Sequence, residues 1–437
     1  MSGFKLILGL GVTGSSCVNY FTKNDIKFRI FDTRPPSSID QSVSLNDANI
    51  LYLQKYDDAI FDQVDEVVIS PGFDKNHEIL KESAIRGIPQ LTDIDIFKRK
   101  CNKPIISITV TNGKTTIVSM IEHILCRAGF KAIACGNNGI SPLSICTDAY
   151  DYIILELSSY QLEYMCDFNS HISLLANIDQ DHLERHENML DYLSIKLKIF
   201  KLSKFSIINK SLLEDYQSKI EINGKYMYGL TDRNILINNQ IIKDISYDSS
   251  TLYFNKNFDL PHRGFHNLEN ILGVCSVAEM LNIDIIECLK SLISYSHLPH
   301  RIELVHSFKN IDWYNDSKST NSASTQVALE YLDNNVILIM GGAKKNINYK
   351  SLSPLIDQKV KLLIFIGENK NYINHQLNIS TKIINADSMD DAVIIANDHA
   401  DDGSKILLSP ASPSFDMFNN FEERGNAFKR AIDKYVN

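Results

Sequence analysis

A strand, a glycine-bearing loop and a helix follow one another between residues 104 and 129, and this order constrains the fold more than any other feature. The apolar segment 104–108 is followed by the loop T-V-T-N-G-K-T-T at 109–116. Apolar residues then recur with helical spacing, and Gly129 is a natural stop for that helix. The pattern predicts a strand–loop–helix unit of an α/β sheet.

The residues of this loop are typical of a phosphate-binding site. Gly113 lets backbone N–H groups close on phosphate oxygens, and the helix N-terminus adds partial positive charge. Lys114 would reach the terminal phosphates of ATP, and the Thr115 hydroxyl is suited to Mg²⁺. Val110 stands where such loops usually open with glycine, so an ordinary turn before a helix is the alternative.

Composition limits the class of protein. A chain of 437 residues predicts about three domains, and 44% hydrophobic with 22% charged residues is typical of a soluble enzyme. The net charge of −9 argues against nucleic-acid binding. The eight cysteines form no C-x-x-C pair, which favours reduced thiols. With no apolar run of membrane length and no signal peptide, we expect a cytoplasmic protein without membrane insertion.

Short apolar segments alternate with helix-length segments through most of the chain, which predicts an α/β fold with mostly parallel sheets. A polar stretch at 210–258 is expected to form short antiparallel strands. The expected strands are 5–8, 28–31, 66–69, 104–108, 152–157, 172–177, 336–340, 362–366 and 405–409.

A second glycine loop, G-L-G-V-T-G at 9–14, follows the first expected strand, and Asp32 ends the next one. This is a dinucleotide-binding fingerprint, which alone would favour a nicotinamide-dependent oxidoreductase. Two alternatives stay open: a tight turn that binds nothing, and a site for another nucleotide diphosphate. The turn Ser70-Pro71-Gly72 would lie at the same sheet edge.

Polar residues also end the strands of the middle region. Glu156 ends a strand, where its carboxylate would suit Mg²⁺, although the serines at 158 and 159 could simply cap a helix. His182 lacks partners at zinc spacing, so a structural role is the alternative for it. The loop around Asn137 could position a substrate. Composition favours exposed, solvated side chains for Lys196 and its neighbour Lys198.

The last third carries further charged and polar loops. Arg301 could stabilise phosphoryl charge, whereas Asp316 and Lys318 would otherwise be ordinary loop charges. Small polar residues after the last strand, at 409–418, suggest recognition of a small polar substrate.

Together these segments resemble the Mur ligase family of peptidoglycan synthesis, in the same order and over the whole chain. The resemblance favours the branch that adds D-glutamate. It rests on the motifs T-N-G-K-T-T, E-L-S-S-Y-Q-L-E, D-H, G-F-H-N-x-x-N, L-P-H-R-I-E, N-D-S-K-S-T-N and S-P-x-x-x-S-F-D-M-F-x-x-F-x-x-R-G. The chain departs from the family at Val110 and at Ala343-Lys344, where a D-G pair is common.

The resemblance implies three domains: a Rossmann-like N-terminal domain at 1–92, a central P-loop ATPase-type domain at 93–297, and a Rossmann-like C-terminal domain at 298–437. It implies ATP and Mg²⁺ as cofactors, with UDP-N-acetylmuramoyl-L-alanine and D-glutamate as substrates. The substrate carboxylate would be phosphorylated, and the D-glutamate amine would attack the acyl phosphate. We expect a monomer.

The resemblance also implies roles for individual residues, with Lys114, His182 and Lys196 as catalytic. Those expected to bind the UDP-substrate are Val12, Thr13, Asp32, Thr33, Arg34, Ser70, Pro71, Gly72 and Asn137. Those expected around ATP are Thr111, Asn112, Gly113, Lys114, Thr115, Thr116, Asn270, Arg301 and Asp316. Those expected to bind D-glutamate are Lys318, Thr320, Lys345, Ser414 and Phe421. The expected metal ligands are Thr115, Glu156, His182 and, as a carbamate formed with CO₂, Lys196.

Other functions remain open at the level of sequence. The chain could be another Mur ligase or a ligase similar to folylpolyglutamate synthase, which an amino-acid panel separates. It could be an oxidoreductase that uses the loop at 9–14, which NADH binding would support. It could also be a non-catalytic nucleotide sensor, given Val110, whereas loss of turnover in Lys114→Ala would favour the enzyme.

Overall fold

The computed structural model describes residues 3–35, 50–165, 169–179, 181, 185–201, 203–216, 225–231, 234–242, 245–247, 251–254, 258–261, 265–295, 299–344 and 347–436. The chain divides into two compact units, each with its own sheets. Unit 1 comprises Met1–Ile178, His186–Lys243 and Glu269–Ile293, and unit 2 comprises Asp179–Arg185, Asp244–Leu268 and Ser294–Asn437.

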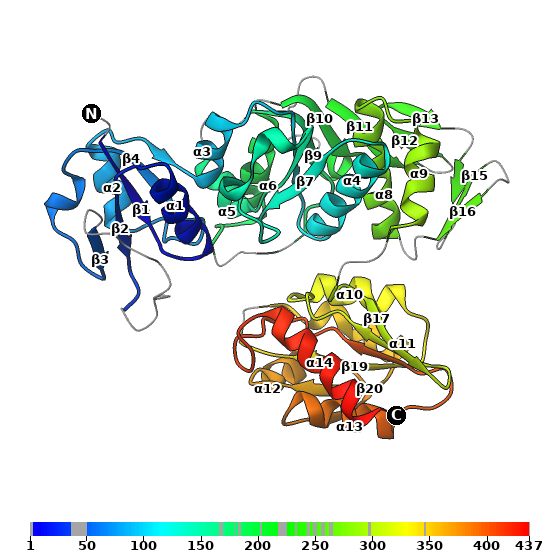
Figure 1. Cartoon of the computed structure of the whole chain (residues 1–437). Helices are drawn as coiled ribbons and strands as arrows, with labels where there is room; N and C mark the ends of the chain where they lie inside the picture. The colour runs from blue at the N-terminus through cyan, green and yellow to red at the C-terminus, as the bar shows by residue number, and fades with distance from the viewer. Residues whose placement is uncertain are drawn as a thin grey trace. The chain divides into compact units, whose positions relative to one another are not determined.

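The N-terminal part of unit 1 is a parallel sheet, drawn in blue in Figure 1, with the order β3-β2-β1-β4-β5. The order reverses between β1 and β4, so their carboxyl ends form the edge at which such sheets bind ligands. The strands are β1 (Phe4–Leu8), β2 (Phe28–Asp32), β3 (Ile50–Leu53), β4 (Val64–Ile69) and β5 (Gln90–Leu91), and the helices are α1 (Val12–Lys23), α2 (Glu78–Ile85) and α3 (Asp93–Lys100).

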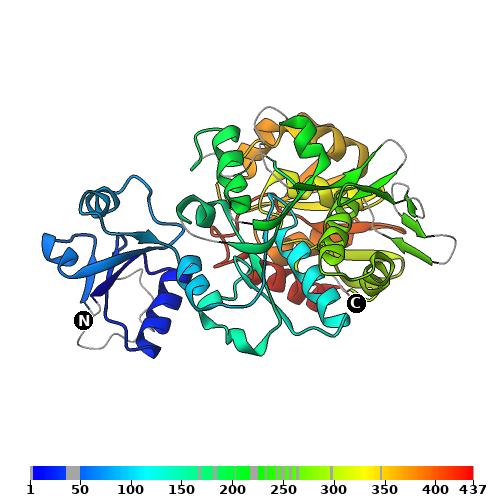
Figure 2. The same ribbon diagram turned by 90° about the horizontal axis from the view of Figure 1, so that it is seen from above.

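Alternate side chains of this sheet enter two cores, because successive residues of a strand point to opposite faces. Ile7 and Phe28 pack with α1, which runs beside the blue strands in Figure 2. Leu6 and Phe31 pack on the other side with α2. The first core continues without a break into the central sheet and includes Ile153 there, so both sheets of unit 1 share one hydrophobic cluster.

The central sheet has the order β13-β12-β11-β10-β9-β6-β8-β7, parallel from β11 to β7. The strands are β6 (Ile105–Thr109), β7 (Ala132–Gly136), β8 (Tyr152–Glu156), β9 (Ser170–Leu175), β10 (Ser203–Asn209), β11 (Lys225–Leu230), β12 (Ile235–Ile237) and β13 (Gln240–Ile242). The helices are α4 (Lys114–Arg127), α5 (Ser159–Tyr164), α6 (Met189–Leu197), α7 (Lys210–Asp215), α8 (Phe265–Met280) and α9 (Ile285–Ile293).

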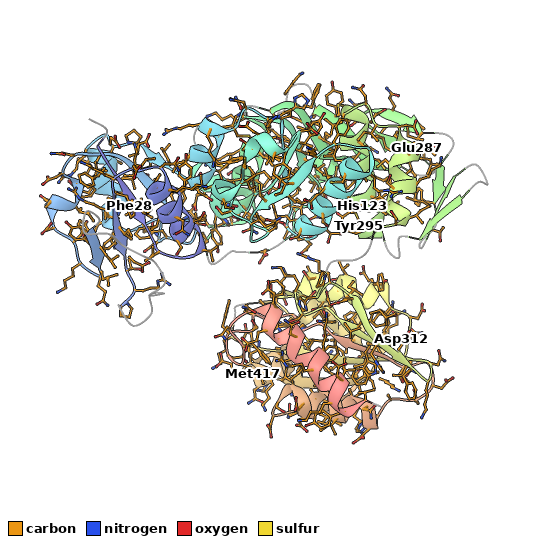
Figure 3. All side chains as sticks on the ribbon, viewed as in Figure 1. Phe28, His123, Glu287, Tyr295, Asp312 and Met417 are labelled. Atoms are coloured by element: carbon orange, nitrogen blue, oxygen red, sulfur yellow. The ribbon has the colours of Figure 1, made fainter. Side chains whose placement is uncertain are left out.

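A hydrogen bond joins the helices α4 and α9. The Nε2 atom of His123, a residue labelled in Figure 3, lies 2.9 Å from the carbonyl oxygen of Ser291.

The stretch 210–258 was predicted to be antiparallel, and this is correct only in part. Residues 210–215 form α7, and β11 continues the parallel sheet beside β10. The strands β12 and β13 are antiparallel, as are β14 (Ile245–Tyr247), β15 (Thr251–Phe254) and β16 (Phe258–Pro261) of a separate small sheet.

The C-terminal part of unit 2 contains a sheet of order β17-β18-β22-β19-β20-β21, in which only β17 is antiparallel to its neighbour. Figure 1 shows α14, in red, across one face, where Phe428 packs against Ile339 and Ile364. The elements are β17 (Glu303–Phe308), β18 (Ile311–Asn315), β19 (Val336–Gly341), β20 (Val360–Ile366), β21 (Lys382–Asn385), β22 (Lys405–Leu408), α10 (Ser322–Tyr331), α11 (Ser353–Lys359), α12 (Lys370–Gln376), α13 (Met389–Asp398) and α14 (Phe421–Tyr435).

Within the described part of the chain, no helix combines the length and apolar character that crossing a membrane requires.

Candidate functional site

A cavity of about 670 Å³ in unit 1 contains all nine residues expected to bind the UDP-substrate. The start of α1 supplies Val12 and Thr13, and the end of β2 with the segment after it supplies Asp32, Thr33 and Arg34. The loop after β4 supplies Ser70, Pro71 and Gly72, and the loop after β7 supplies Asn137. The sequence analysis missed other lining residues, among them Phe73, Asp93 and Tyr160. Tyr160 belongs to the quoted E-L-S-S-Y-Q-L-E motif, whereas no signal pointed to Asp93.

The carboxylate of Asp32 is already occupied by protein donors. It accepts hydrogen bonds from the Leu10 N–H (2.6 Å) and the Arg34 N–H (2.8 Å), and the Arg34 guanidinium lies 2.8 Å away. Burial alone would raise the pKa of Asp32, but the Arg34 guanidinium and the two N–H groups outweigh it, so the pKa is lowered. An acid closed off in this way is poorly placed to bind the ribose of a dinucleotide.

Asp93 has the opposite electrostatic character in the same cavity. It begins α3, is 3% exposed, and its Oδ1 has no hydrogen-bond partner. Burial raises its pKa to about 7, opposed by the N–H groups of Ile94 and Asp93. The cavity therefore holds one firmly ionised carboxylate and one that titrates near neutrality.

Residues 110–113 form the loop between β6 and α4, as predicted, and the loop and the first turn of α4 together contain Thr111, Asn112, Gly113, Lys114, Thr115 and Thr116. Gly113 has φ +83°, a conformation that favours glycine. A Cβ there would lie 2.9 Å from Nδ2 of Asn270, so the predicted ATP-binding residue Asn270 approaches the loop backbone. The Lys114 ammonium donates to the carbonyls of Val110 (2.6 Å) and Thr111 (3.0 Å).

Asn177, which the sequence analysis left without a role, holds this loop in shape. Its Oδ1 accepts from the N–H groups of Thr111 (3.0 Å) and Asn112 (2.9 Å), and its Nδ2 donates to the Asn112 carbonyl (2.9 Å). The side-chain amide of Asn177, just after β9, thus fixes the loop that follows the neighbouring strand β6.

The prediction of an exposed, solvated side chain is wrong for Lys196. It is 1% exposed, and its ammonium donates to Thr109 Oγ1 (3.0 Å) and to the Val110 carbonyl (2.9 Å). Its position on α6 turns it toward the sheet, whereas Lys198 is exposed as expected. Composition could not distinguish the two, because a helical face is set by tertiary packing. The Val110 carbonyl therefore accepts hydrogen bonds from both lysines of this site.

Glu156 ends β8, as predicted, and is 2% exposed. Its Oε1 accepts from Nδ2 of Asn137 (3.1 Å), while its Oε2 is buried without a hydrogen-bond partner. Ser158 also caps α5, with Gln161 completing a capping box, so the helix-capping interpretation of this motif is confirmed. An unsatisfied buried carboxylate oxygen fits a divalent cation.

Among the residues that the structure describes, no group of three or more His, Cys, Asp or Glu is assembled for a metal. His182 lies outside the described residues. The described donors expected around Mg²⁺ are then one hydroxyl (Thr115), one carboxylate (Glu156) and Lys196, which would need to become a carbamate to coordinate a cation.

In unit 2, Asp316 follows β18 and is buried. Its carboxylate accepts from the hydroxyls of Ser319 (2.5 Å) and Ser409 (2.8 Å) and from the Ile302 N–H (3.3 Å). Burial raises its pKa to about 7, opposed by these hydrogen bonds and by the charge of Arg301.

The predicted D-glutamate residues gather at the carboxyl ends of β18 and β22 and at the start of α14. The Lys318 ammonium lies 3.8 Å from the centre of the Phe421 ring, a cation–π contact. Thr320 is half-buried and Ser414 is buried. Lys345 lies outside the described residues.

Comparisons with known proteins agree with the three large α/β sheets described above. The family models of the Mur ligase MurD-like N-terminal domain, the Mur ligase middle domain and the Mur ligase glutamate ligase domain match residues 4–92, 108–278 and 300–412.

Two curated relatives, both named UDP-N-acetylmuramoylalanine--D-glutamate ligase, match nearly the whole chain. The protein of Buchnera aphidicola subsp. Acyrthosiphon pisum (strain Tuc7) is 34% identical, over 98% of this chain and 97% of the relative. The protein of Coxiella burnetii (strain Dugway 5J108-111) is 33% identical, over 98% of each.

Among solved structures, the MurF ligase from Thermotoga maritima in complex with ADP has a TM-score of 0.60 at 14% identity, covering 98% of this chain and 95% of that one. At this identity the likeness concerns the fold, which is α/β with three domains: a Rossmann-like N-terminal domain, a central P-loop domain and a Rossmann-like C-terminal domain. The chain belongs to the Mur ligase family.

Proposed function

We propose that this chain is an ATP-dependent amide ligase that adds D-glutamate to UDP-N-acetylmuramoyl-L-alanine in the synthesis of peptidoglycan precursors. Full-length relatives at 33–34% identity carry the name of that activity. The domain limits 1–92, 93–297 and 298–437 remain part of the proposal, as do a monomeric state and a cytoplasmic location.

The observation that carries the proposal is the connection between the cavity and the phosphate loop. Asn137 lines the cavity and donates to Glu156, and Glu156 pairs with Ile108 on β6, next to the start of the phosphate loop. A ligand that fills the cavity thus reaches the strand edge at which ATP phosphates would bind. This is what transfer of a phosphoryl group to a carboxylate of the UDP-substrate requires.

We assign the nine cavity residues to the UDP-substrate, and the loop at 111–116 with Asn270, Arg301 and Asp316 to ATP. The Lys114 ammonium would leave the carbonyls of its own loop and neutralise the terminal phosphates of ATP. Thr115, Glu156, His182 and a carbamylated Lys196 would hold Mg²⁺. When bound, Mg²⁺ would supply positive charge against the phosphate oxygens.

The reaction then proceeds in two steps. A carboxylate oxygen of the UDP-substrate attacks the γ-phosphorus, the bond to the ADP oxygen breaks, and an acyl phosphate forms. The D-glutamate amine attacks the acyl carbon, and the tetrahedral intermediate loses a proton from nitrogen and expels phosphate to leave an amide. We assign Lys318, Thr320, Lys345, Ser414 and Phe421 to D-glutamate. The protein contributes mainly positioning and charge stabilisation.

The test is phosphate release from ATP by the purified chain with UDP-N-acetylmuramoyl-L-alanine and each amino acid in turn. We expect release with D-glutamate and with no other amino acid. Release with another amino acid only, or NADH binding without turnover, would contradict the proposal. Light scattering during gel filtration tests the monomer, whose mass is 49.5 kDa.

A further inference from the structure

Arg424 is a fully buried arginine that the proposed function leaves without a role. It lies in the first turn of α14, belongs to the F-x-x-R-G motif, and is 1% exposed. Phe428, one turn later on the same face, packs in the core of the C-terminal sheet. The helix therefore directs the guanidinium toward the sheet. Arginine side chains are rarely buried completely, so this position implies a specific role.

The guanidinium joins two loops at the carboxyl edge of this sheet. Its Nε donates to Ser317 Oγ (3.0 Å) and one terminal nitrogen donates to the Ser317 carbonyl (2.7 Å). The other terminal nitrogen donates to the Ser412 carbonyl (2.9 Å). Ser317 Oγ in turn donates to the Phe421 carbonyl (2.8 Å). One side chain thus fixes the loop after β18, the loop after β22 and the start of α14.

A third loop, after β19, passes close to the same group. A Cβ at Gly342 would lie 3.2 Å from an Arg424 terminal nitrogen and 2.2 Å from the Pro413 carbonyl oxygen, so this position has little room for a side chain. The loop is held there by Asn369, whose Oδ1 accepts from the Gly342 N–H (2.9 Å) and whose Nδ2 donates to Ser412 Oγ (2.8 Å).

The charge of Arg424 is met by neutral acceptors. All three of the hydrogen bonds described above end on hydroxyl or carbonyl oxygens. Burial lowers its pKa to about 10, and Asp416 and Asp316 oppose this through space. A buried cation without a direct ion pair is costly, and its charge is offset only through space, by Asp416 and Asp316.

We propose that Arg424 is a positioning residue of the amino-acid site: it fixes the loops that carry Lys318, Ser414 and Phe421, and its charge attracts an amino acid with two carboxylates. This inference rests on the proposed function, because it takes D-glutamate as the amino acid. The residues assigned to D-glutamate are immediate neighbours of its partners, since Lys318 follows Ser317 and Ser414 lies two residues after Ser412.

The experiment compares Arg424→Met and Arg424→Lys with the wild-type chain in steady-state assays that vary each substrate separately. Arg424→Met removes charge and hydrogen bonds, and we expect the KM for D-glutamate to rise about thirtyfold while the KM values for ATP and the UDP-substrate change less than about twofold. Arg424→Lys keeps the charge but loses the planar fork, so we expect an increase of about fivefold.

Arg430→Met is the matched control, since Arg430 lies on the same helix and is exposed. It should leave all three KM values unchanged. Direct calorimetric binding of D-glutamate to each protein, together with thermal melting, separates a lost site from a lost fold. If the Arg424 variants do not fold, Ser317→Ala, which removes one acceptor and the link to Phe421, should raise the KM for D-glutamate about threefold.

An unchanged KM for D-glutamate in Arg424→Met, or an equal rise for all three substrates, would overturn the positioning role while leaving the proposed function intact. A wild-type chain that neither binds nor uses D-glutamate would overturn both.

Discussion

Unit 1 contains two strand–loop–helix turns that each include a glycine with positive φ but differ in side-chain chemistry. The first runs from β1 to α1 and the second from β6 to α4, and each has a glycine with positive φ, Gly9 at +85° and Gly113 at +83°. Each lies where its sheet changes direction, with neighbours added on both sides of β1 and of β6. The sequence predicts phosphate binding at both turns.

The groups that face the two loops differ. The first loop points its Leu10 N–H at the Asp32 carboxylate, which Arg34 also covers. The second loop presents its Val110 carbonyl to two ammonium groups, Lys114 and Lys196. A loop lined by a closed ion pair suits a ligand recognised by shape, whereas a loop with two lysines suits a concentrated negative charge. Side chains from neighbouring strands, more than the glycine spacing, thus distinguish the two loops.

The largest effect is expected for Lys114→Ala in the second loop. Loss of the ammonium that would neutralise the ATP phosphates should reduce kcat by roughly 10²–10³. Binding of the UDP-substrate to the first loop should stay within about twofold of wild type, since Lys114 does not line that cavity. Phosphate release and calorimetric binding of the UDP-substrate measure the two quantities.

Lys131→Ala, an exposed lysine just after α4, is the control and should behave as wild type. If Lys114→Ala instead weakened the UDP-substrate as much as it slowed turnover, the functional division between the loops would be wrong.

Next in size is Lys196→Ala. The carbamate hypothesis predicts a loss of about a hundredfold in kcat, because a metal ligand disappears. Formate or acetate should partly restore activity by entering the space of the lost side chain and supplying a carboxylate. Lys198→Ala is the control, since Lys198 is exposed two residues away and donates to the Glu163 carbonyl. Wild-type rates in Lys196→Ala would reject the hypothesis.

These two lysines show what the sequence could and could not predict. Apolar runs bounded by glycine and polar residues predicted the strands that end near Asp32, near Glu156 and before the loop at 110–113. The strand ends in the structure lie within a residue or two of those predictions. Parallel sheets bring strand ends to one edge, so the approach of the loop at 9–14, Asp32 and the turn at 70–72 also follows from local patterns. The full set of nine cavity residues came from the resemblance to the Mur ligases.

Contacts between distant segments did not follow from local patterns. Burial of Lys196 depends on how α6 packs beside the end of β6. The partners of its ammonium, Val110 and Thr109, lie 86 and 87 positions away in the sequence. The Asn177 clamp depends on the register of β9 beside β6. The unpartnered Oδ1 of Asp93 depends on how α3 enters the shared core of unit 1. A single sequence holds no signal for such tertiary neighbours.

A smaller effect is expected for Asn177→Ala, which frees the backbone of the phosphate loop without removing a charge. Three hydrogen bonds to Thr111 and Asn112 disappear, and we expect the KM for ATP to rise about tenfold. Asn177→Asp keeps the acceptor but loses the donor and adds negative charge near the phosphates, so its KM for ATP should rise further. Equal KM values in all three proteins would show that the loop keeps its shape without the clamp.

The last prediction concerns stability and uses two carboxylates of the same cavity. The pKa of Asp93 is raised to about 7, so its ionised form destabilises the fold. That cost is absent below the unfolded value of 3.8, grows as pH rises, and is complete above about pH 7. Asp93→Asn should therefore raise the Tm by a few degrees, more at pH 8 than at pH 5.

Asp32 should show the reverse dependence. Its pKa is lowered, so its ionised form stabilises the fold at every pH above the unfolded value of 3.8, and this contribution is lost as pH falls through the lowered folded value. Asp32→Asn should lower the Tm at pH 7 and approach the wild-type Tm under acidic conditions. Melting curves of both variants from about pH 2 to pH 8 decide the matter, because the Asp32 contribution is lost only below 3.8. A change in Tm of the same sign in both variants would contradict this contrast between the two carboxylates. The contrast rests on the contacts of Asp32 with Arg34 and with the Leu10 N–H, which make its ionised form stabilising. The ionised form of Asp93 lacks such contacts at Oδ1 and is destabilising.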